Sequence, residues 1–250
     1  MEIVFLGTGG GRINLLKQIR GTGGFRINST SANIHIDPGP GALVHSVKLR
    51  QSLLDIDAVI VTHGHLDHYS DAMVLIEGMS AYGLKKRGIF ICNKNSIDYV
   101  SPWHKSKIGE LYLVVNGEKK TFKTEKGSFE IETMAMKHDE ESAFGFKLFM
   151  DEKVIGHITD TEYFDGLEKG FEGCDLLIVN CIKPEPDKYK GHLETADVIK
   201  ILKKAKPKKC VITHMGIKML RAGPLKQAER IKNETGIETV AAKDGMRIIC

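Results

Sequence analysis

Short apolar runs separated by polar and glycine-rich segments recur along the chain. Ile3–Leu6, Ala32–Ile36 and Ala58–Val61 are too short for helices and rich in β-branched residues, so they predict buried strands. Similar runs predict further strands at Ile89–Cys92, Glu110–Val115, Phe129–Met136, Phe144–Met150, Lys153–Thr159, Leu176–Asn180 and Cys210–Thr213, and final strands around Val240 and at Gly245–Ile249. The pattern between the strands that start at Phe144 and Lys153 predicts a hairpin with its turn at Asp151-Glu152.

Helices are predicted where apolar residues recur every three or four positions. Leu43–Leu54, Glu194–Ala205 and Pro224–Thr235 have this spacing, and we expect the second to be capped near Thr195. Strands and helices follow one another without a linker or a low-complexity tract. We therefore predict one domain that spans residues 1–250.

Two segments far apart in the chain have similar sequences. Val59–Gly64 reads VIVTHG and Val211–Gly216 reads VITHMG, and a predicted helix precedes each. In a chain built from two related halves, both strand ends would meet at one edge of paired sheets. This similarity predicts a layered α/β sandwich.

Composition limits the class of protein. Apolar residues make up 42% and charged residues 27% of the 250 residues, which excludes a disordered or fibrous chain. No apolar run approaches the roughly 18 residues of a membrane span, and the first residues lack the pattern of a signal peptide. The five cysteines form no Cys-x-x-Cys pair, which suits free thiols in a reducing compartment. We expect a cytoplasmic protein with no membrane partner.

The formal net charge of +4 arises in one glycine-rich stretch. Positions 3 to 36 contain no acidic residue, and their four basic residues are Arg12, Lys17, Arg20 and Arg26. Glycines let backbone N–H groups approach an anion closely, so this stretch suits a phosphate-bearing substrate, and we predict that the four basic residues bind it. The alternative is a flexible surface loop with solvated arginines.

The strongest chemical signal is Thr62-His63-Gly64-His65-Leu66-Asp67-His68, which follows a predicted strand. An extended segment projects His63 and His65 to the same side, and a following helical turn would place Asp67 and His68 at a second position close by. One loop can thus serve two adjacent metal sites. Imidazole and carboxylate ligands suit zinc best, with manganese and iron as alternatives.

The spacing His-x-His-x-Asp-His resembles the signature of the metallo-β-lactamase superfamily. That resemblance implies a four-layer αβ/βα sandwich, a further histidine after a strand, a bridging carboxylate and a last histidine near the C-terminus. The candidates for these three roles are His138, Asp160 and His214. By resemblance, one cation is bound by His63, His65 and His138, the other by Asp67, His68 and His214, with Asp160 between them.

The resemblance also implies an activity, hydrolysis by water that two divalent cations activate. Histidine at position 65 makes redox chemistry a minor alternative, because superfamily members that bind two irons typically have glutamate there. His192, in Gly191-His192-Leu193, resembles the histidine that phosphodiesterase branches place beside the leaving group, as general acid or as a phosphate ligand. Helix capping is the alternative for His192. We expect His192 and Asp67 to be the catalytic residues.

Lactam, thioester and phosphodiester hydrolases share this centre, so the surroundings must indicate the substrate. The basic stretch and the His192 segment favour a phosphodiester, as in ribonuclease Z-like enzymes. Only 22 positions separate His138 from Asp160, which leaves no room for the RNA-gripping arm of those relatives. We predict a small phosphodiester or nucleotide derivative as substrate. A nuclease for RNA ends, a thioesterase or glyoxalase-like hydrolase and, last, a non-catalytic binding module remain alternatives, and a homodimer is a possible assembly.

Overall fold

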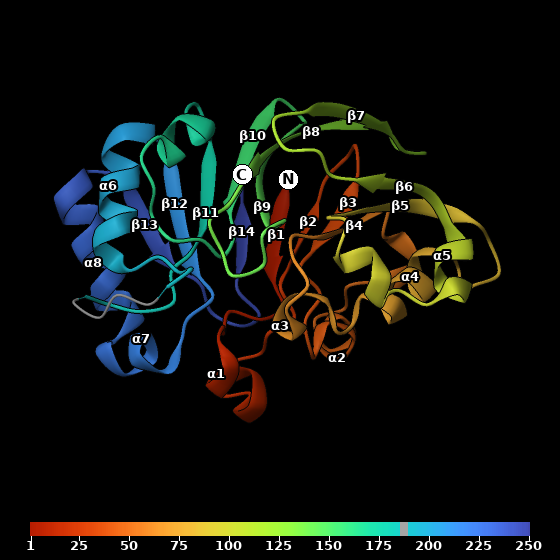
Figure 1. Ribbon diagram of the computed structural model, residues 1–250, viewed down its shortest axis with the longest axis horizontal. Coiled ribbons are helices and arrows are strands. Elements are labelled where there is room, and N and C mark those ends of the chain that lie inside the picture. Colours follow the sequence, from red (N-terminus) through yellow and green to blue (C-terminus); the bar gives the residue numbers. More distant parts are fainter. Residues whose placement is uncertain (186–189) are drawn as a thin grey trace.

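Residues 1–185 and 190–250 are described by a computed structural model, in which two seven-stranded sheets lie face to face (Figure 1). In sheet order, the first consists of β14 (Arg247–Ile249), β1 (Glu2–Phe5), β2 (Phe25–Asn28), β3 (Asn33–Ile36), β4 (Ala58–Val61), β5 (Arg87–Cys92) and β6 (Ile108–Leu113). The second consists of β13 (Glu238–Ala241), β12 (Lys209–Thr213), β11 (Leu176–Asn180), β10 (Lys153–Ile158), β9 (Phe144–Met150), β8 (Ser128–Ala135) and β7 (Lys119–Lys123).

Helices cover the two outer faces. Outside the second sheet lie α6 (Thr195–Ala205) and α8 (Pro224–Thr235), whereas α4 (Ala72–Met79) lies outside the first (Figure 1). Buried Phe and Ile side chains from both sheets fill the space between them. The four-layer sandwich predicted from the sequence is therefore confirmed. The remaining helices are α1 (Arg12–Lys17), α2 (Ala42–Lys48), α3 (Leu66–Tyr69), α5 (Pro102–Lys107), α7 (Ile217–Ala222) and the 3-10 turns η1 (Leu53–Asp55), η2 (Ser96–Tyr99) and η3 (Leu167–Phe171).

The two strands that end in Thr-His occupy equivalent places in the two sheets. β4 pairs in parallel with β3 and β5, and β12 pairs in parallel with β11 and β13. Their carboxyl ends meet at one edge of the sandwich, where Nε2 of His68, shortly after β4, lies 3.1 Å from Nε2 of His214 after β12. The sequence similarity between the two segments thus predicted their juxtaposition correctly. The hairpin of β9 and β10 also turns at Asp151-Glu152, as expected.

Several elements differ from the sequence prediction. The helix expected over Leu43–Leu54 ends at Lys48, because Arg50 adopts a left-handed φ of 57° that breaks the helix, and η1 follows as a separate turn. The strands β2 and β7 were not predicted, because a buried arginine or exposed lysines interrupt their apolar pattern. The short helices α1, α4, α5 and α7 were also missed.

The glycine-rich ends of the N-terminal stretch are packed, whereas α1 between them is largely exposed. The Asp244 carboxylate accepts hydrogen bonds from the Thr8 N–H and hydroxyl and from the Gly21 N–H. A side chain at Gly10 would collide with the His214 ring, because a Cβ there would lie 2.2 Å from Nδ1. Glycine is therefore needed to bring the backbone against His214.

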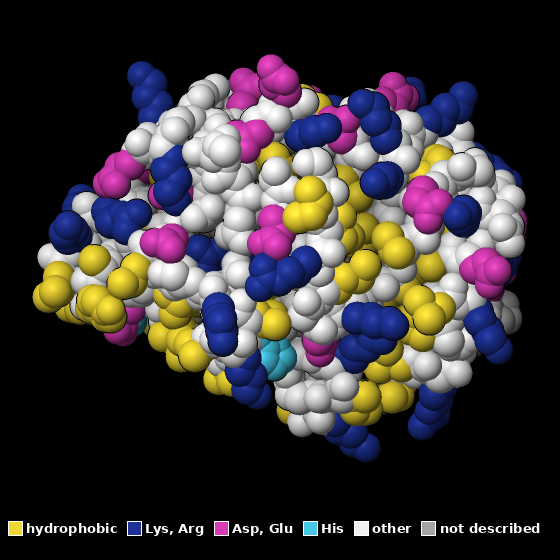
Figure 2. Space-filling model, turned by 180° about the vertical axis from the view of Figure 1, so that it is seen from behind, with side chains coloured by type: hydrophobic (Ala, Val, Ile, Leu, Met, Phe, Trp, Pro, Cys, Tyr) yellow, Lys and Arg dark blue, Asp and Glu magenta, His cyan; other side chains and the backbone are white. Residues whose placement is uncertain are grey.

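The surface carries mixed charges. Viewed from behind, the Lys and Arg side chains are interspersed with Asp and Glu and do not form one basic patch (Figure 2). Among the described residues, no helix has both the length and the apolar character needed to traverse a bilayer. All five cysteines are free thiols.

Candidate metal centre

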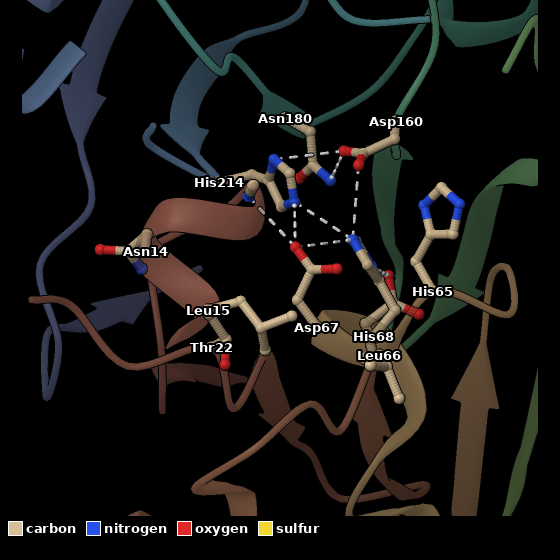
Figure 3. Close-up of polar contacts among 12 residues, drawn as sticks. Asn14, Leu15, Thr22, His65, Leu66, Asp67, His68, Asp160, Asn180 and His214 are labelled. Atoms are coloured by element: carbon tan, nitrogen blue, oxygen red, sulfur yellow. Dashed lines mark hydrogen bonds and ion pairs between the residues drawn. The ribbon is translucent and has the colours of Figure 1, made fainter. Parts of the chain in front are cut away.

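Strand ends deliver the predicted ligands to one place. The turn after β4 carries His63 and His65, and α3 begins at once and carries Asp67 and His68. His138, Asp160 and His214 follow β8, β10 and β12 at the same edge of the sandwich. Figure 3 shows Asp67, His68, Asp160 and His214 converging, with His65 to one side. The structure thus brings all seven predicted ligands together.

The donor atoms form overlapping groups within 4.8 Å of one another. We call His63, His65 and His138 the open triad, because the side chain of His65 is 37% exposed. We call Asp67, His68 and His214 the buried triad, because both of its histidines are buried. These are the two ligand sets that the resemblance implied.

In both triads, the distances between histidine nitrogens are those expected of two ligands that bind one metal ion. Nε2 of His138 lies 3.1 Å from Nδ1 of His65, and Nε2 of His68 lies 3.1 Å from Nε2 of His214. Zinc–nitrogen bonds of about 2.0–2.1 Å at tetrahedral angles place two ligand nitrogens about 3.3 Å apart. Nε2 of His63 is buried without a hydrogen-bond partner, which would be costly unless a cation binds it. The residues therefore fit divalent cations.

Asp160 stands between the triads. Its Oδ1 lies 3.3 Å from Nδ1 of His214, and its Oδ2 lies 3.4 Å from Nε2 of His68 and 3.9 Å from Nε2 of His63. The Asn180 side-chain amide donates to Oδ1 at 2.8 Å and fixes the carboxylate. Burial alone raises the pKa of Asp160, but His214, His192 and His68 outweigh it and lower the pKa well below its ordinary value. Asp160 is thus an ionised carboxylate facing both triads.

Backbone and carboxylate groups orient the ligands. The His138 Nδ1–H donates to the Gly191 carbonyl oxygen at 2.9 Å, and the His68 Nδ1–H donates to Asp37 Oδ2 at 2.9 Å. In both rings this leaves the Nε2 lone pair for a cation. The Gly11 N–H donates to Asp67 Oδ2 at 3.1 Å.

Asp37 supports the buried triad through its contact with His68. It adopts a left-handed φ of 50°, as does His214 with a φ of 57°, and such strain is characteristic of functional sites. The Thr62 N–H and hydroxyl donate to the Asp37 carboxylate at 2.7 and 2.8 Å. Sequence reasoning missed Thr62, although its place before His63 in a repeated Thr-His pair was a signal.

Burial and neighbouring charges shift the pKa values of His63 and His68 in opposite directions. Burial lowers the pKa of His63 well below its ordinary value, and neighbouring His68 adds to this effect. Burial also opposes protonation of His68, but the carboxylates of Asp37, Asp160 and Asp67 outweigh it and raise the pKa of His68 well above its ordinary value. The carboxylates thus create a strongly negative environment that favours a cation.

His192 lies at the junction of the two triads. Its Nδ1 is 3.5 Å from Asp160 Oδ2, and its ring centroid is 5.1 Å from that of His138 and 6.0 Å from that of His214. Burial lowers the pKa of His192 to about 4, although Asp160 opposes this shift. His138, Asp160 and His192 also satisfy the distance criterion for binding a metal. The geometry therefore allows His192 to contact either substrate or a cation.

A family model described as a beta-lactamase superfamily domain matches residues 32–215, which include this cluster. The chain belongs to the beta-lactamase superfamily. Among similar proteins, the uncharacterized protein MJ1374 of Methanocaldococcus jannaschii is 34% identical over 99% of this chain and 94% of its own length. Ribonuclease Z of Sulfolobus acidocaldarius is 22% identical over 94% of each chain.

Solved structures agree on the fold of this superfamily member. The metallo-β-lactamase fold protein YhfI of Bacillus subtilis superposes with a TM-score of 0.81 at 18% identity over 99% of this chain and 98% of its own. The short form of human tRNase Z has a TM-score of 0.76 at 18% identity over 100% and 99% of the two chains. A diphosphatase of the PhnP family has a TM-score of 0.70 at 17% identity over 100% and 98%. The chain therefore has the metallo-β-lactamase fold.

Two of the four predicted substrate-binding residues serve the fold of this superfamily member. Arg26 is buried in β2, where its Nη1 donates to the Ser52 carbonyl oxygen at 2.6 Å, so our prediction that it contacts substrate is wrong. Arg20 donates to the Thr8 hydroxyl and to the Ala242 carbonyl oxygen, which ties the glycine-rich stretch to the C-terminal segment. Arg12 and Lys17 are exposed on α1, so substrate binding stays a prediction for these two.

Proposed function

We propose that this protein is a metal-dependent phosphodiesterase that hydrolyses a small phosphodiester or nucleotide derivative. Two divalent cations, with zinc first and manganese or iron as alternatives, would bind the open and the buried triad, and Asp160 would bridge them. When bound, the cations make hydroxide available near neutral pH and stabilise charge on the phosphoryl oxygens. Asp67 would help to bind one of these cations and would orient the attacking water.

The position of His192 carries the proposal. It lies beside Asp160 and between the rings of His138 and His214, where a phosphate at the two cations would meet it. Its pKa of about 4 makes the imidazole neutral at pH 7, so it retains one N–H to donate to a phosphoryl oxygen. This favours the phosphate-holding role over that of a general acid. A lactam or thioester carbonyl carries no such anionic oxygens in its ground state.

The similar proteins lend support to phosphate chemistry. Two relatives are named ribonuclease Z, and one similar structure is a diphosphatase. The exposed Arg12 directly follows Gly11, whose N–H donates to Asp67. A positively charged residue is thus adjacent in sequence to a residue that contacts the centre. Ribonuclease Z similarity also favours the second candidate, a nuclease that acts on RNA ends.

A substrate panel tests the reaction class. The protein, loaded with zinc or manganese, is assayed with bis(p-nitrophenyl) phosphate, an acyl thioester and a chromogenic β-lactam. We expect the phosphodiester to have the highest kcat/KM. Preferential hydrolysis of the thioester would support the thioesterase or glyoxalase-like alternative instead, and bound metal without any turnover would support a non-catalytic binding module.

Replacement of His192 tests its role. We expect His192→Ala to lower the phosphodiesterase rate by roughly 10²–10⁴ while the metal content stays unchanged. His104→Ala is the matched control, because this histidine lies on α5 beside Glu77. Unchanged turnover in His192→Ala would remove it from the mechanism, and loss of metal would make it a ligand.

The proposal includes a cellular location and an oligomeric state. The free thiols support our expectation that the enzyme works in the cytoplasm. A homodimer stays a prediction, which the mass in solution measured by light scattering would test.

A further inference from the structure

A pair of stacked tyrosines lies beside the turn that carries His63 and His65. The rings of Tyr69 in α3 and Tyr99 at the end of η2 have centroids 4.6 Å apart and planes inclined by 15°. Tyr69 packs partly against the core outside the first sheet, whereas Tyr99 is 49% exposed. Half of a large aromatic side chain therefore faces solvent without being needed to complete the core.

Tyr99 touches the backbone that joins two candidate ligands. Gly64 lies between His63 and His65, and a Cβ at Gly64 would come within 2.7 Å of Tyr99 Cε2. The ring edge thus rests on the turn that supports the open triad. His65 is the ligand of that triad with the most exposed side chain. The partly exposed Tyr99 ring therefore contacts the residue that directly precedes His65.

Hydrogen bonds hold the segment that carries Tyr99 in place. The Glu140 carboxylate accepts from the side-chain amides of Asn93 and Asn95, both at 2.6 Å, and from the Gly64 N–H at 3.4 Å. Asn93 Oδ1 accepts from the Ser96 N–H at 2.7 Å at the start of η2. The same carboxylate thus ties the metal-binding turn to the loop before Tyr99. A surface held in place in this way loses little conformational entropy when a ligand binds.

We propose that Tyr99 is a stacking platform for the nucleobase of a nucleotide whose phosphate lies at the open triad. This inference rests on the proposed phosphodiesterase function and deepens it by assigning an aromatic base to the substrate. Base–aromatic stacking contributes about 1–3 kcal/mol and accepts any base, because every base has a π-face. A mononucleotide ester and the end of an oligonucleotide share this chemistry.

Binding measurements separate the base from the phosphate. Calorimetric titrations of the metal-loaded protein with thymidine 5′-monophosphate and with methyl phosphate give two Kd values, whose ratio measures the contribution of the nucleoside. We expect Tyr99→Leu to raise the Kd of thymidine 5′-monophosphate about 5- to 150-fold and to leave the Kd of methyl phosphate unchanged. Tyr99→Phe keeps the ring and should stay within about twofold of the wild type.

The control is Tyr82→Leu, because Tyr82 is 70% exposed in the turn after α4, away from the metal-binding residues in sequence. It should leave both Kd values unchanged. Titration with pentathymidylate distinguishes an oligonucleotide end from a mononucleotide as the ligand. If pentathymidylate binds more tightly than the mononucleotide and Tyr99→Leu abolishes this binding, the ligand is an oligonucleotide end. If both bind equally and Tyr99→Leu weakens both, the ligand is a mononucleotide. Both results support the platform.

Two results would overturn it. One is equal affinity of the wild type for thymidine 5′-monophosphate and methyl phosphate, and the other is an equal effect of Tyr99→Leu on both ligands. Hydrolysis of bis(p-nitrophenyl) phosphate by the wild type is measured separately. Failure of the proposed function thus appears in that assay, whereas failure of the platform appears in the ratio of Kd values.

Discussion

The open and the buried triad use similar donors in different surroundings. His68 in the buried triad donates to the Asp37 carboxylate, whereas His138 in the open triad donates to the Gly191 carbonyl oxygen. A carboxylate partner makes a ligand imidazole more basic than a carbonyl partner does. The buried triad is therefore suited to holding a cation firmly, and the open triad, where His65 reaches solvent, is suited to meeting substrate. One centre combines a structural and an accessible half.

The largest effect should follow from removing the carboxylate that both halves share. In Asp160→Ala, we expect the metal content to fall from two ions per chain to one or fewer, because Asp160 faces His68 and His214 as well as His63. Phosphodiesterase activity should fall to that of the metal-free protein. Elemental analysis and kinetics measure both. Asp165→Ala, an exposed residue five positions further along the same loop, is the control, and two retained ions in Asp160→Ala would remove the bridge.

The next effect distinguishes the two halves directly. Asp37→Asn keeps a hydrogen-bonding side chain but removes the negative charge behind His68. We therefore expect the affinity of the buried triad for its cation to fall about 10- to 100-fold. Asp139→Asn is the comparison on the open side, where the carboxylate is 60% exposed, and it should change affinity only slightly. Competition with a chelator gives both affinities. Equal losses in the two variants would contradict the division into halves.

A smaller effect concerns the stability of the strand behind the buried triad. His35 lies in β3, its Nε2–H donates to the Gly23 carbonyl oxygen at 2.9 Å, and burial lowers its pKa to about 3. The unfolded state, with an ordinary pKa near 6.5, binds the proton first, so stability is full at higher pH and falls as pH drops from about 6.5 towards 3. From pH 7.5 to 5, His35 should lower the free energy of unfolding by about 2 kcal/mol.

Urea unfolding of the metal-free wild type and of His35→Gln at the two pH values measures this loss. Gln cannot take up the proton, so the wild type should lose about 2 kcal/mol more than the variant between pH 7.5 and 5. An equal pH dependence in both proteins would show that His35 does not stay neutral in the folded state.

The smallest effect concerns the exposed basic residues of α1. Arg12→Ala and Lys17→Ala should each raise KM for phosphodiesters by a few-fold, because an exposed charge contributes on the order of 1 kcal/mol or less. Arg247→Ala, in β14 beside Glu2, is the control and should leave KM unchanged. No change in KM for Arg12 or Lys17 would return both to an ordinary surface role.

The metal-binding residues were easier to predict from the sequence than the residues around them, for a physical reason. His63, His65, Asp67 and His68 lie within six positions, so one local pattern revealed them. The Asp37 contact with His68 depends on how β3 lies beside β4, which no local pattern in the sequence decides. Family resemblance rather than local pattern supplied His138, Asp160 and His214.

Charge and exposure were harder to predict than ligand type. Arg26 looked like part of a basic surface, because a strand interrupted by arginine has no clear apolar alternation and its burial depends on the neighbouring strands. Tyr99 had no signal as a functional residue, since its exposure and its contact with Gly64 arise only when η2 folds against the turn after β4. Local motifs thus predict the ligands, whereas tertiary packing determines what surrounds them.

We propose that seven side chains hold two cations at this edge of the sandwich. The most direct test is an anomalous difference map from crystals of the zinc-loaded protein, collected on both sides of the zinc absorption edge. We predict two peaks, one within bonding distance of the open triad and one within bonding distance of the buried triad, with Asp160 contacting both. A single peak, or zinc bound away from these residues, would contradict the account.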